Sequence, residues 1–453
     1  MTNDECYLRL ANQFDQHAGG APKNGDQESA AFFEYLKLLY SPEQANLLQH
    51  LKPTTQFYAS RFNVDDYTSI GRLSELSGVE VDKIRELLDP LVLFNTLQSN
   101  YIPADHLSEK EKAERGSKRV KSMIGVLGWS GFLRLMASLI KSNIRDMAVY
   151  GIKKTQGLVN NPLYALPIYP AMLNIHQINP AVREEDVQAG LLYQEFFIKE
   201  GYYKRYQTSD LGTPTFRTIP IHHAIQHEKT ILDGEEAFAI IDASPSAVLL
   251  PCPCRTRTEK LGIRECKDKY PVAACLMLNL SAAFLEYIGA GQVLSKEKAK
   301  EYLTNMQQLG LVVATENFSD LNHFIICACC ECCCSMLRGR TRWDNPEAML
   351  PSNYVPDTND NCVFCGKCAE KCPLEAISVS KDDKTFQVET ERCIGCGVCT
   401  TACKKENLKL IRHERSTPPR DAQHMHDRIY SENKGPALSA EAYLRGWRGG
   451  KNV

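Results

Sequence analysis

CVFCGKCAEKCP (residues 362–373) and CIGCGVCTTACK (residues 393–404) both carry the spacing CxxCxxCxxxC. This spacing allows a chain to wrap three thiolates around one iron-sulphur cube and to send the fourth thiolate to a neighbouring cube. The alternative is a four-cysteine zinc site at each motif, but such sites normally use paired CxxC knuckles rather than a triple one. The two motifs therefore predict a pair of [4Fe-4S] clusters.

The residues between the two motifs predict short strands. ISVS (377–380) and FQVE (386–389) alternate between apolar and polar residues, and the turn-rich KDDK joins them. With its two motifs, the segment 355–412 is similar to the bacterial two-cluster ferredoxin. That resemblance implies a βαββαβ-type domain that binds two [4Fe-4S] clusters.

The same resemblance implies that each cluster takes three thiolates from one motif and the fourth from the other. The ligands of the first cluster would be Cys362, Cys365, Cys368 and Cys403. The ligands of the second cluster would be Cys393, Cys396, Cys399 and Cys372. Pro373 matches the family pattern after the fourth cysteine, whereas its counterpart is Lys404, a departure that bears on local charge and removes no ligand.

The 19 cysteines of the chain are distributed unevenly, since all except Cys6 lie between residues 252 and 403. The beginning of the chain, MTNDECYLRL, is polar and acidic without an apolar core, so we expect no signal peptide and a cytoplasmic location. In a reducing compartment, dense cysteine indicates metal binding rather than a disulfide framework. The first half of the chain is therefore expected to have a different role from the second.

Length and composition predict a folded, soluble protein with about two to four domains, and the elements expected along the chain make its fold class α+β. Lysine and arginine (53) nearly balance aspartate and glutamate (55), so no global charge attracts nucleic acid or an anionic membrane. We expect a helical, winged-helix-like domain at 1–110, a charged linker with an amphipathic helix at 111–155, a mixed cysteine-rich domain at 156–340, the ferredoxin domain at 355–412 and a polar tail at 413–453.

A second group of cysteines begins at the sequence PCPCR. AVLLP (247–251) predicts a buried strand that ends there, and an extended chain would point Cys252 and Cys254 to one side. Cys266 and Cys275 follow in the sequence, so we expect these four thiols to gather around the strand end as a third cluster site. The alternative for Cys275, within the apolar run AACLML, is a buried core thiol.

The run CACCECCC (327–334) follows a predicted helix and hairpin. The helix is bounded by Ser295 as N-cap and Gly310 as its stop, and LVVAT and HFIICAC then predict two strands that pair. A helix followed by a hairpin is a winged-helix-like arrangement. The second strand leads directly into the cysteine run.

This run places six cysteines in eight residues, more than one metal ion can use. We expect Cys327 and Cys329 to share a strand face, while Cys330, Cys333 and Cys334 converge only if the chain turns helical. Three or four of the six would bind one metal centre, and the others would be supporting thiols, ligands of another centre or a redox-active pair. The candidate ligands in the run are Cys327, Cys329, Cys330, Cys332, Cys333 and Cys334.

PCPCR, the two cysteines after it and CACCECCC together resemble a loosely characterised family of multi-cluster iron-sulphur proteins from anaerobic bacteria and archaea. The resemblance covers residues 209–412 and implies electron transfer through one or two clusters beyond the ferredoxin pair. CPC with further cysteines also resembles ferredoxin:thioredoxin reductase more weakly, because the later cysteines do not form the CPC and CHC pairs of that family.

The first half of the chain is predicted to be helical. TSIGRLSELSG (68–78) and VDKIRELLDPLVLF (81–94) resemble the second and third helices of a winged-helix fold, a fold that often binds DNA. The second of these helices is rich in acidic residues, which suits phosphates poorly, so we expect a scaffold or dimerisation role and no nucleic-acid partner.

MIGVLGWSGFLRLMASLI (123–140) predicts a helix with a broad apolar face and a polar stripe that includes Arg134. The stripe disfavours a membrane span, and the helix would be buried in the core or against a partner subunit, or lie on a membrane surface. In the polar tail, we expect His424 and His426 to be solvated rather than bound to metal.

These patterns predict an anaerobe-type electron carrier or oxidoreductase subunit rather than a stand-alone enzyme, with a redox protein as partner. One alternative is a redox-sensing winged-helix regulator, and another is an iron-sulphur oxidoreductase whose upstream cluster binds substrate. The sequence contains no Walker A motif and no GxGxxG in a strand-turn-helix unit, so nucleotide binding is not expected.

Overall fold

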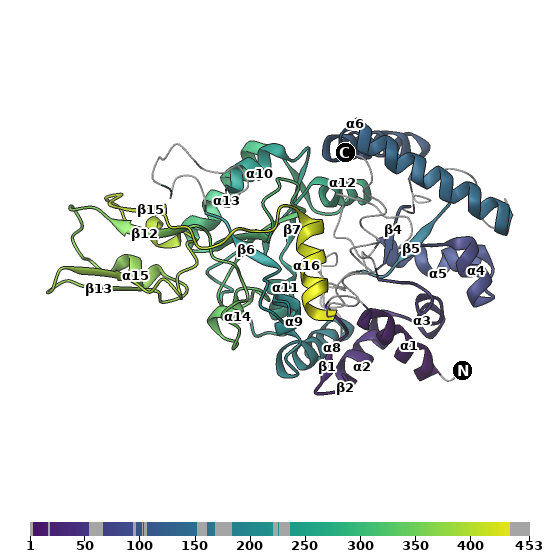
Figure 1. Cartoon of the computed structure of the whole chain (residues 1–453), viewed down its shortest axis with the longest axis horizontal. Helices are drawn as coiled ribbons and strands as arrows, with labels where there is room; N and C mark the ends of the chain where they lie inside the picture. The colour runs from purple at the N-terminus through teal and green to yellow at the C-terminus, as the bar shows by residue number, and fades with distance from the viewer. Residues whose placement is uncertain are drawn as a thin grey trace. The chain divides into compact units, whose positions relative to one another are not determined.

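The computed structural model describes residues 3–16, 19–53, 67–93, 97–101, 103, 107–151, 161–167, 184–220, 225 and 236–434. The chain divides into two compact units: unit 1 comprises Met1–Tyr206 with His426–Val453, and unit 2 comprises Gln207–Met425. Helices and small sheets alternate along the chain (Figure 1). The predicted mixed α and β, multidomain character is therefore confirmed.

Unit 1 is mainly helical. Its helices are α1 (Asn3–Asp15), α2 (Ala30–Leu39), α3 (Pro42–Leu48), α4 (Ile70–Ser77), α5 (Val81–Leu93), α6 (Glu109–Tyr150), α8 (Glu184–Tyr193), the π-helix η4 (Gln194–Lys199) and α9 (Tyr203–Gln207), whose last residue begins unit 2. Its strands are β1 (Lys23–Asn24), β2 (Gln27–Glu28), β3 (Thr68–Ser69), β4 (Gln98–Ser99) and β5 (Leu163–Ala165), which form a β1-β2 pair and a β3-β5-β4 sheet. Phe196 is fully buried and makes edge-to-face contacts with Phe32 and Tyr35 of α2, so aromatic packing ties η4 to this helix.

The two helices predicted at 68–94 are present as α4 and α5. Ser69 caps α4 by accepting a hydrogen bond from the Arg72 amide, and Gly78 ends the helix in the left-handed conformation with φ 71°. The winged-helix arrangement of these helices and the role of this region stay predictions.

Helix α6 covers the predicted helix at 123–140 but is broken inside it. Gly128 has φ 66° and ψ 168°, which a helix cannot accommodate, and close to it the segments Glu109–Gly125 and Leu127–Tyr150 are bent by 113° relative to each other. Trp129 and Leu133 after the break are exposed (67% and 60%), so these two side chains are not core. Within the described residues, no single helix is long and apolar enough to cross a membrane, although the two segments of α6 meet that criterion as a bent pair.

The last described helix, α16 (Ala422–Lys434), corrects one prediction about the tail. His424 is exposed, as expected, and shares a hydrogen bond with Asp421. His426 is buried, with 4% of its surface exposed, and burial lowers its pKa to about 3. The prediction that His426 is solvated is therefore wrong, because an amphipathic helix buries one face of this segment.

Unit 2 is built around a six-stranded antiparallel sheet with the order β6-β10-β11-β8-β7-β9. Its strands are β6 (Phe216–Thr218), β7 (Ala247–Pro251), β8 (Ala273–Leu278), β9 (Gln292–Leu294), β10 (Val312–Glu316) and β11 (Ile325–Cys329). Its helices are α10 (Ala237–Ala243), α11 (Pro253–Lys260), α12 (Asn279–Ile288), α13 (Lys296–Leu309) and α14 (Arg338–Thr341). Fully buried Leu276, Val313 and Ile326 form part of the core on this sheet.

The predicted helix and hairpin before the cysteine run are confirmed. Ser295 caps α13, Gly310 ends it with φ 109°, and β10 pairs with β11. The hairpin is not a terminal wing, because β11 also pairs with β8 and so lies inside the sheet. The register sets Cys327 of β11 opposite Cys275 of β8, and this places two cysteines from distant parts of the chain side by side.

The ferredoxin segment follows in the order β12 (Tyr354–Thr358), α15 (Lys367–Lys371), β13 (Ile377–Ser380), β14 (Thr385–Val388), the 3₁₀ helix η7 (Val398–Ala402) and β15 (Leu408–Arg412). β12 pairs with β15, and the two strands predicted between the motifs pair as β13 and β14. These elements lie together at the left of Figure 1. The segment joins the six-stranded sheet through Leu350, which exchanges backbone hydrogen bonds with Phe216 and Thr218 of β6.

Gly395 in the second motif offers a test of this packing. Its φ is 65°, and the equivalent residue of the first motif, Phe364, adopts a similar φ of 51°, so backbone conformation alone does not require glycine. A β-carbon at Gly395 would collide with the Ser352 hydroxyl and the Tyr354 carbonyl, whereas one at Gly366 (φ 77°) would meet nothing within 4 Å.

We therefore expect Gly395→Ala to lower the thermal unfolding midpoint of the clusters' visible absorbance more than Gly366→Ala does. Both variants carry a left-handed strain of about 1–2 kcal/mol, and only Gly395→Ala adds overpacking of about 1–3 kcal/mol. Equal midpoints for the two variants would contradict the close approach of residues 352–354 to the second motif.

Candidate metal centres

The ten cysteines between residues 252 and 334 divide into two sets. The four-thiol set is Cys266, Cys330, Cys332 and Cys333. The six-thiol set is Cys252, Cys254, Cys275, Cys327, Cys329 and Cys334. All ten are candidate ligands from the sequence, but the division between the sets differs from the predicted one.

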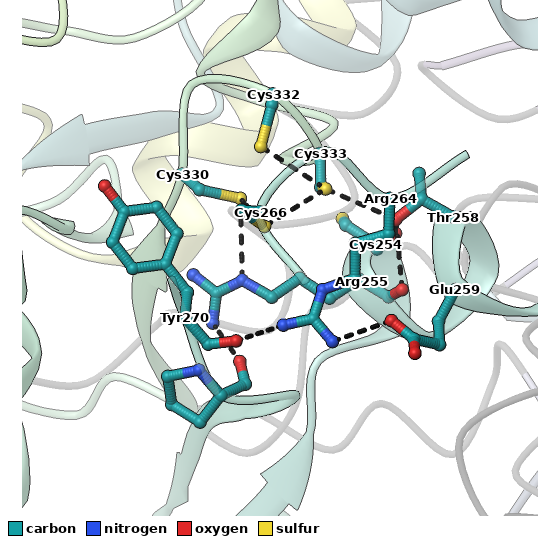
Figure 2. A network of polar contacts seen from close by, with 11 residues as sticks. Cys254, Arg255, Thr258, Glu259, Arg264, Cys266, Tyr270, Cys330, Cys332 and Cys333 are labelled. Carbon is teal, nitrogen blue, oxygen red and sulfur yellow. Dashed lines mark hydrogen bonds and ion pairs between the residues drawn. The ribbon is translucent and has the colours of Figure 1, made fainter. Parts of the chain in front are cut away.

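The four-thiol set is compact and buried. The Sγ atom of Cys266 lies 3.7 Å from that of Cys333 and 4.0 Å from that of Cys330, and the Sγ atoms of Cys332 and Cys333 are 3.6 Å apart. All four sulphur atoms lie within 4.8 Å of one another. Figure 2 shows them gathered beside Arg255, Arg264 and Thr258.

A change of backbone geometry separates neighbours in the cysteine run. Strand β11 ends at Cys329, and the following turn is closed by a hydrogen bond from the Cys334 amide to the Cys330 carbonyl. The predicted change from strand to a helical turn is thus confirmed, and it brings Cys330 and Cys333 together. Cys334 does not join them, because its thiol interacts with Cys254 and Cys329 of the six-thiol set.

The placement of Cys266 corrects a second prediction. We expected it to join Cys252, Cys254 and Cys275 around the end of β7. The structure instead places Cys266, in the irregular loop between α11 and β8, against the four-thiol set. In a long loop without regular structure, tertiary contacts decide where the Cys266 side chain lies. The pattern of the sequence does not predict such contacts.

The six-thiol set forms a closed series of contacts around the ends of β7, β8 and β11. The interacting thiols run in the order Cys252, Cys254, Cys334, Cys329, Cys327, Cys275 and back to Cys252. The set therefore brings the cysteines that follow β7 together with those of β11, an approach that the sequence alone does not establish. Cys275 is a member of this series, in contact with other thiols, rather than a core thiol surrounded by apolar side chains alone.

We expected CPCR to be extended, but it is not. Cys252 is the N-cap of α11 and Pro253 occupies the first turn, where its fixed φ favours a helix. Cys254 nevertheless faces Cys252, and its Sγ accepts a hydrogen bond from the Ser335 amide at 3.3 Å.

Two members of the six-thiol set favour the thiolate form. Hydrogen bonds from Cys252 and Cys327 lower the pKa of Cys275 to about 5, against the opposite effect of burial. Hydrogen bonds from Cys252 and Cys334 likewise hold the pKa of Cys254 well below its ordinary value. Thiolate is the form that binds metal, so this environment suits ligands.

Arg255 supplies the positive charge between the two sets. Its side chain is fully buried, and its Nε donates to the Cys330 Sγ at 3.5 Å while its terminal nitrogens donate to the carbonyls of Pro271 and Ala328. Burial lowers the pKa of Arg255, but the charges of Cys252 and Cys330 outweigh it and raise the pKa above the ordinary value. No carboxylate among the described residues forms an ion pair with Arg255, so thiolates are its counter-charges.

Further polar groups contact the four-thiol set. The Thr258 hydroxyl donates to the Cys333 Sγ at 3.2 Å, and Arg264, which forms an ion pair with Glu259, also interacts with Cys266. These residues and Arg255 were not among the site residues predicted from the sequence. Of these residues, only Arg255 could have been identified from the sequence, because it is a cation inside the PCPCR motif.

The ferredoxin cysteines differ in exposure. Cys365 of the first motif is exposed, whereas Cys393, Cys396 and Cys399 of the second are buried. The charge of Cys372 contributes to the raised pKa values of all three second-motif thiols, after the larger effect of burial. Cys372 therefore lies near the second motif, as an exchange of the fourth ligand requires; the exchange itself stays a prediction.

The donor set of this segment fits [4Fe-4S] clusters. Its two motifs supply eight thiols, and backbone amides of Gly395 and Ala376 donate to the sulphur atoms of Cys393 and Cys372, both at 3.4 Å. Amide hydrogen bonds to sulphur are a normal means of tuning such clusters.

Comparison with known proteins agrees with this geometry. Residues 361–408 match the family model for the 4Fe-4S dicluster domain. No curated protein and no solved structure matches the chain significantly. The dicluster domain and the upstream cysteine sets indicate an iron-sulphur electron-transfer protein.

Removing the charge of Arg255 should deplete the upstream metal centres. In Arg255→Met the thiolates lose their buried counter-charge, a change that costs about 3–5 kcal/mol for a buried pair. Arg255→Lys, which keeps the charge, should retain more metal. Iron, zinc and acid-labile sulphide per chain measure the effect, with the ferredoxin electron paramagnetic resonance (EPR) signal as the folding control. Unchanged metal content in Arg255→Met would contradict this role.

Proposed function

We propose that this protein relays electrons from an external redox partner, through two [4Fe-4S] clusters of the ferredoxin segment, to a centre held by the six-thiol set. The clusters supply one-electron transfer. The chain positions their ligands, buries them and donates hydrogen bonds to sulphur.

The observation that carries this proposal is the position of α13. The Gln307 side chain on this helix is fully buried and donates from Nε2 to the Cys396 carbonyl at 3.0 Å. On the same helix, Met306 and Tyr302 belong to the hydrophobic cluster that contains the upstream cysteines. One helix therefore contacts both the second ferredoxin motif and the upstream thiol sets.

A second contact holds the end of α13 to the ferredoxin segment. Lys371 of α15 donates from Nζ to the carbonyls of Gln308 and Leu309, the last residues of α13. A cation at a helix C-terminus interacts favourably with the helix dipole, by about 0.3–1 kcal/mol. This contact and the Gln307 hydrogen bond keep the second motif against the upstream segment.

The exposure of the two motifs supports a direction for the relay. Cys365 is exposed, so the first motif is accessible to a partner protein. Cys396 is buried, with 8% of its surface exposed, and lies against α13. In the proposed relay, the first motif therefore exchanges electrons with the partner and the second motif with the upstream centre.

Two cysteine variants separate the steps of the relay. Cys254→Ser should remove an upstream EPR signal and spare the ferredoxin pair, which has its own eight thiols. Cys365→Ser should damage the pair and slow reduction of the upstream centre by an external donor. Rapid-freeze EPR follows both centres. If the upstream centre is reduced at an unchanged rate in Cys365→Ser, the proposed order is wrong.

Metal stoichiometry tests whether an upstream cluster exists. Anaerobically purified protein should contain more than the about eight irons that two [4Fe-4S] clusters require, with acid-labile sulphide rising in parallel. A value fixed at eight irons in fully loaded protein would mean that the six-thiol set binds no iron-sulphur cluster.

A further inference from the structure

We propose that the four-thiol set binds a single zinc ion in a closed tetrahedral site, and that iron-sulphur clusters are confined to the ferredoxin segment and the six-thiol set. The residues of this site are Cys266, Cys330, Cys332 and Cys333. The proposal concerns a structural ion and does not depend on the electron relay.

The separation of the sulphur atoms carries the proposal. Four thiolates at about 2.3 Å from one zinc ion occupy the corners of a tetrahedron with edges of about 3.8 Å. Three of the Sγ separations within the set are 3.6, 3.7 and 4.0 Å, and none exceeds 4.8 Å. The set is therefore shaped for one ion at its centre.

A [4Fe-4S] cube requires a wider arrangement, because each thiolate binds a different iron at a different corner. The same chain provides the comparison. Among the described residues, the four-thiol set alone has three or more sulphur atoms mutually within 4.8 Å, and neither the ferredoxin motifs nor the six-thiol set is as compact. The segment that matches a dicluster family thus has the wider spacing, and the four-thiol set differs from it.

The surroundings of the set fit a closed structural site. Each of its four cysteines has less than a tenth of its surface exposed, and the protein supplies all four ligands, as in structural zinc sites. Four thiolates around a divalent ion carry a net charge of about −2. Arg255 donates a hydrogen bond to the Cys330 Sγ and has no carboxylate partner among the described residues, so its charge offsets part of this negative charge, whereas the nearby Arg264 forms an ion pair with Glu259 at 2.8 Å.

The ion would join two segments that have little regular structure. Cys266 lies in the loop between α11 and β8, and the other three ligands lie in the turn after β11. A metal crosslink between them fixes the direction in which the turn leaves the sheet. Cys334, the next residue, is thereby held against Cys254 in the six-thiol set.

Two variants of neighbouring cysteines provide the test, with full-length protein produced anaerobically in medium that contains iron and zinc. Wild type should contain one zinc per chain. Cys332→Ser should lose zinc to a chelator at least about tenfold more readily than wild type and keep the ferredoxin EPR signal. Cys334→Ser, the matched control, should keep zinc and lose upstream iron and sulphide. Loss of about four irons with four sulphides in Cys332→Ser would overturn the proposal.

Measurements on wild type keep the proposal testable if a variant fails to fold. Zinc X-ray absorption should show four sulphur ligands at about 2.3 Å. Nitrogen or oxygen ligands, absence of zinc, or a mononuclear iron without sulphide in its place would overturn the proposal. Failure of the relay would appear instead as an unchanged reduction rate in Cys365→Ser, so the two outcomes are distinguishable.

Discussion

The buried guanidinium of Arg255 is the constraint on which the cysteine-rich part of unit 2 depends. It hydrogen-bonds Cys330 of the four-thiol set, and the charge of Cys252 in the six-thiol set acts on it as well. A buried cation without an opposite charge costs several kcal/mol, and ten protonated thiols would provide none. Metal binding keeps thiols ionised. The charge balance of this region therefore requires a thiolate beside Arg255, and Cys330, which accepts its hydrogen bond, is placed to supply it.

The second constraint is the change from strand to turn between Cys329 and Cys330. Along β11, side chains two residues apart share a face, so Cys327 and Cys329 reach the same set. In the turn that follows, Cys330 and Cys333 meet in the four-thiol set, while Cys334 points back to the six-thiol set. This geometry explains how six cysteines in eight residues serve two sites without competing for one ion.

Much of this arrangement is local and could be predicted from the sequence. The ferredoxin motifs, β7, the β10-β11 hairpin and α13 with its caps follow from spacing, periodicity and end signals. The predictions failed where tertiary contacts decide. Cys266 lies in a loop without periodicity, and the helix beginning at Pro253 was overlooked although proline at a first helical turn indicates it. The buried contact of Gln307 with Cys396 links residues 89 positions apart, and no local pattern predicts it.

A redox-inactive ion in the four-thiol set, as proposed, would keep the charge beside the electron-transfer centre constant. Zinc does not change its oxidation state, so in the proposed arrangement the charge of the four-thiol set stays constant when an electron arrives nearby. Arg255 then keeps one unchanging partner in Cys330, and only its interaction with the six-thiol set varies. A cluster in both sets would change charge on both sides of the same buried cation. In this arrangement the four-thiol set holds Arg255 in place, and only the six-thiol set changes its charge on reduction.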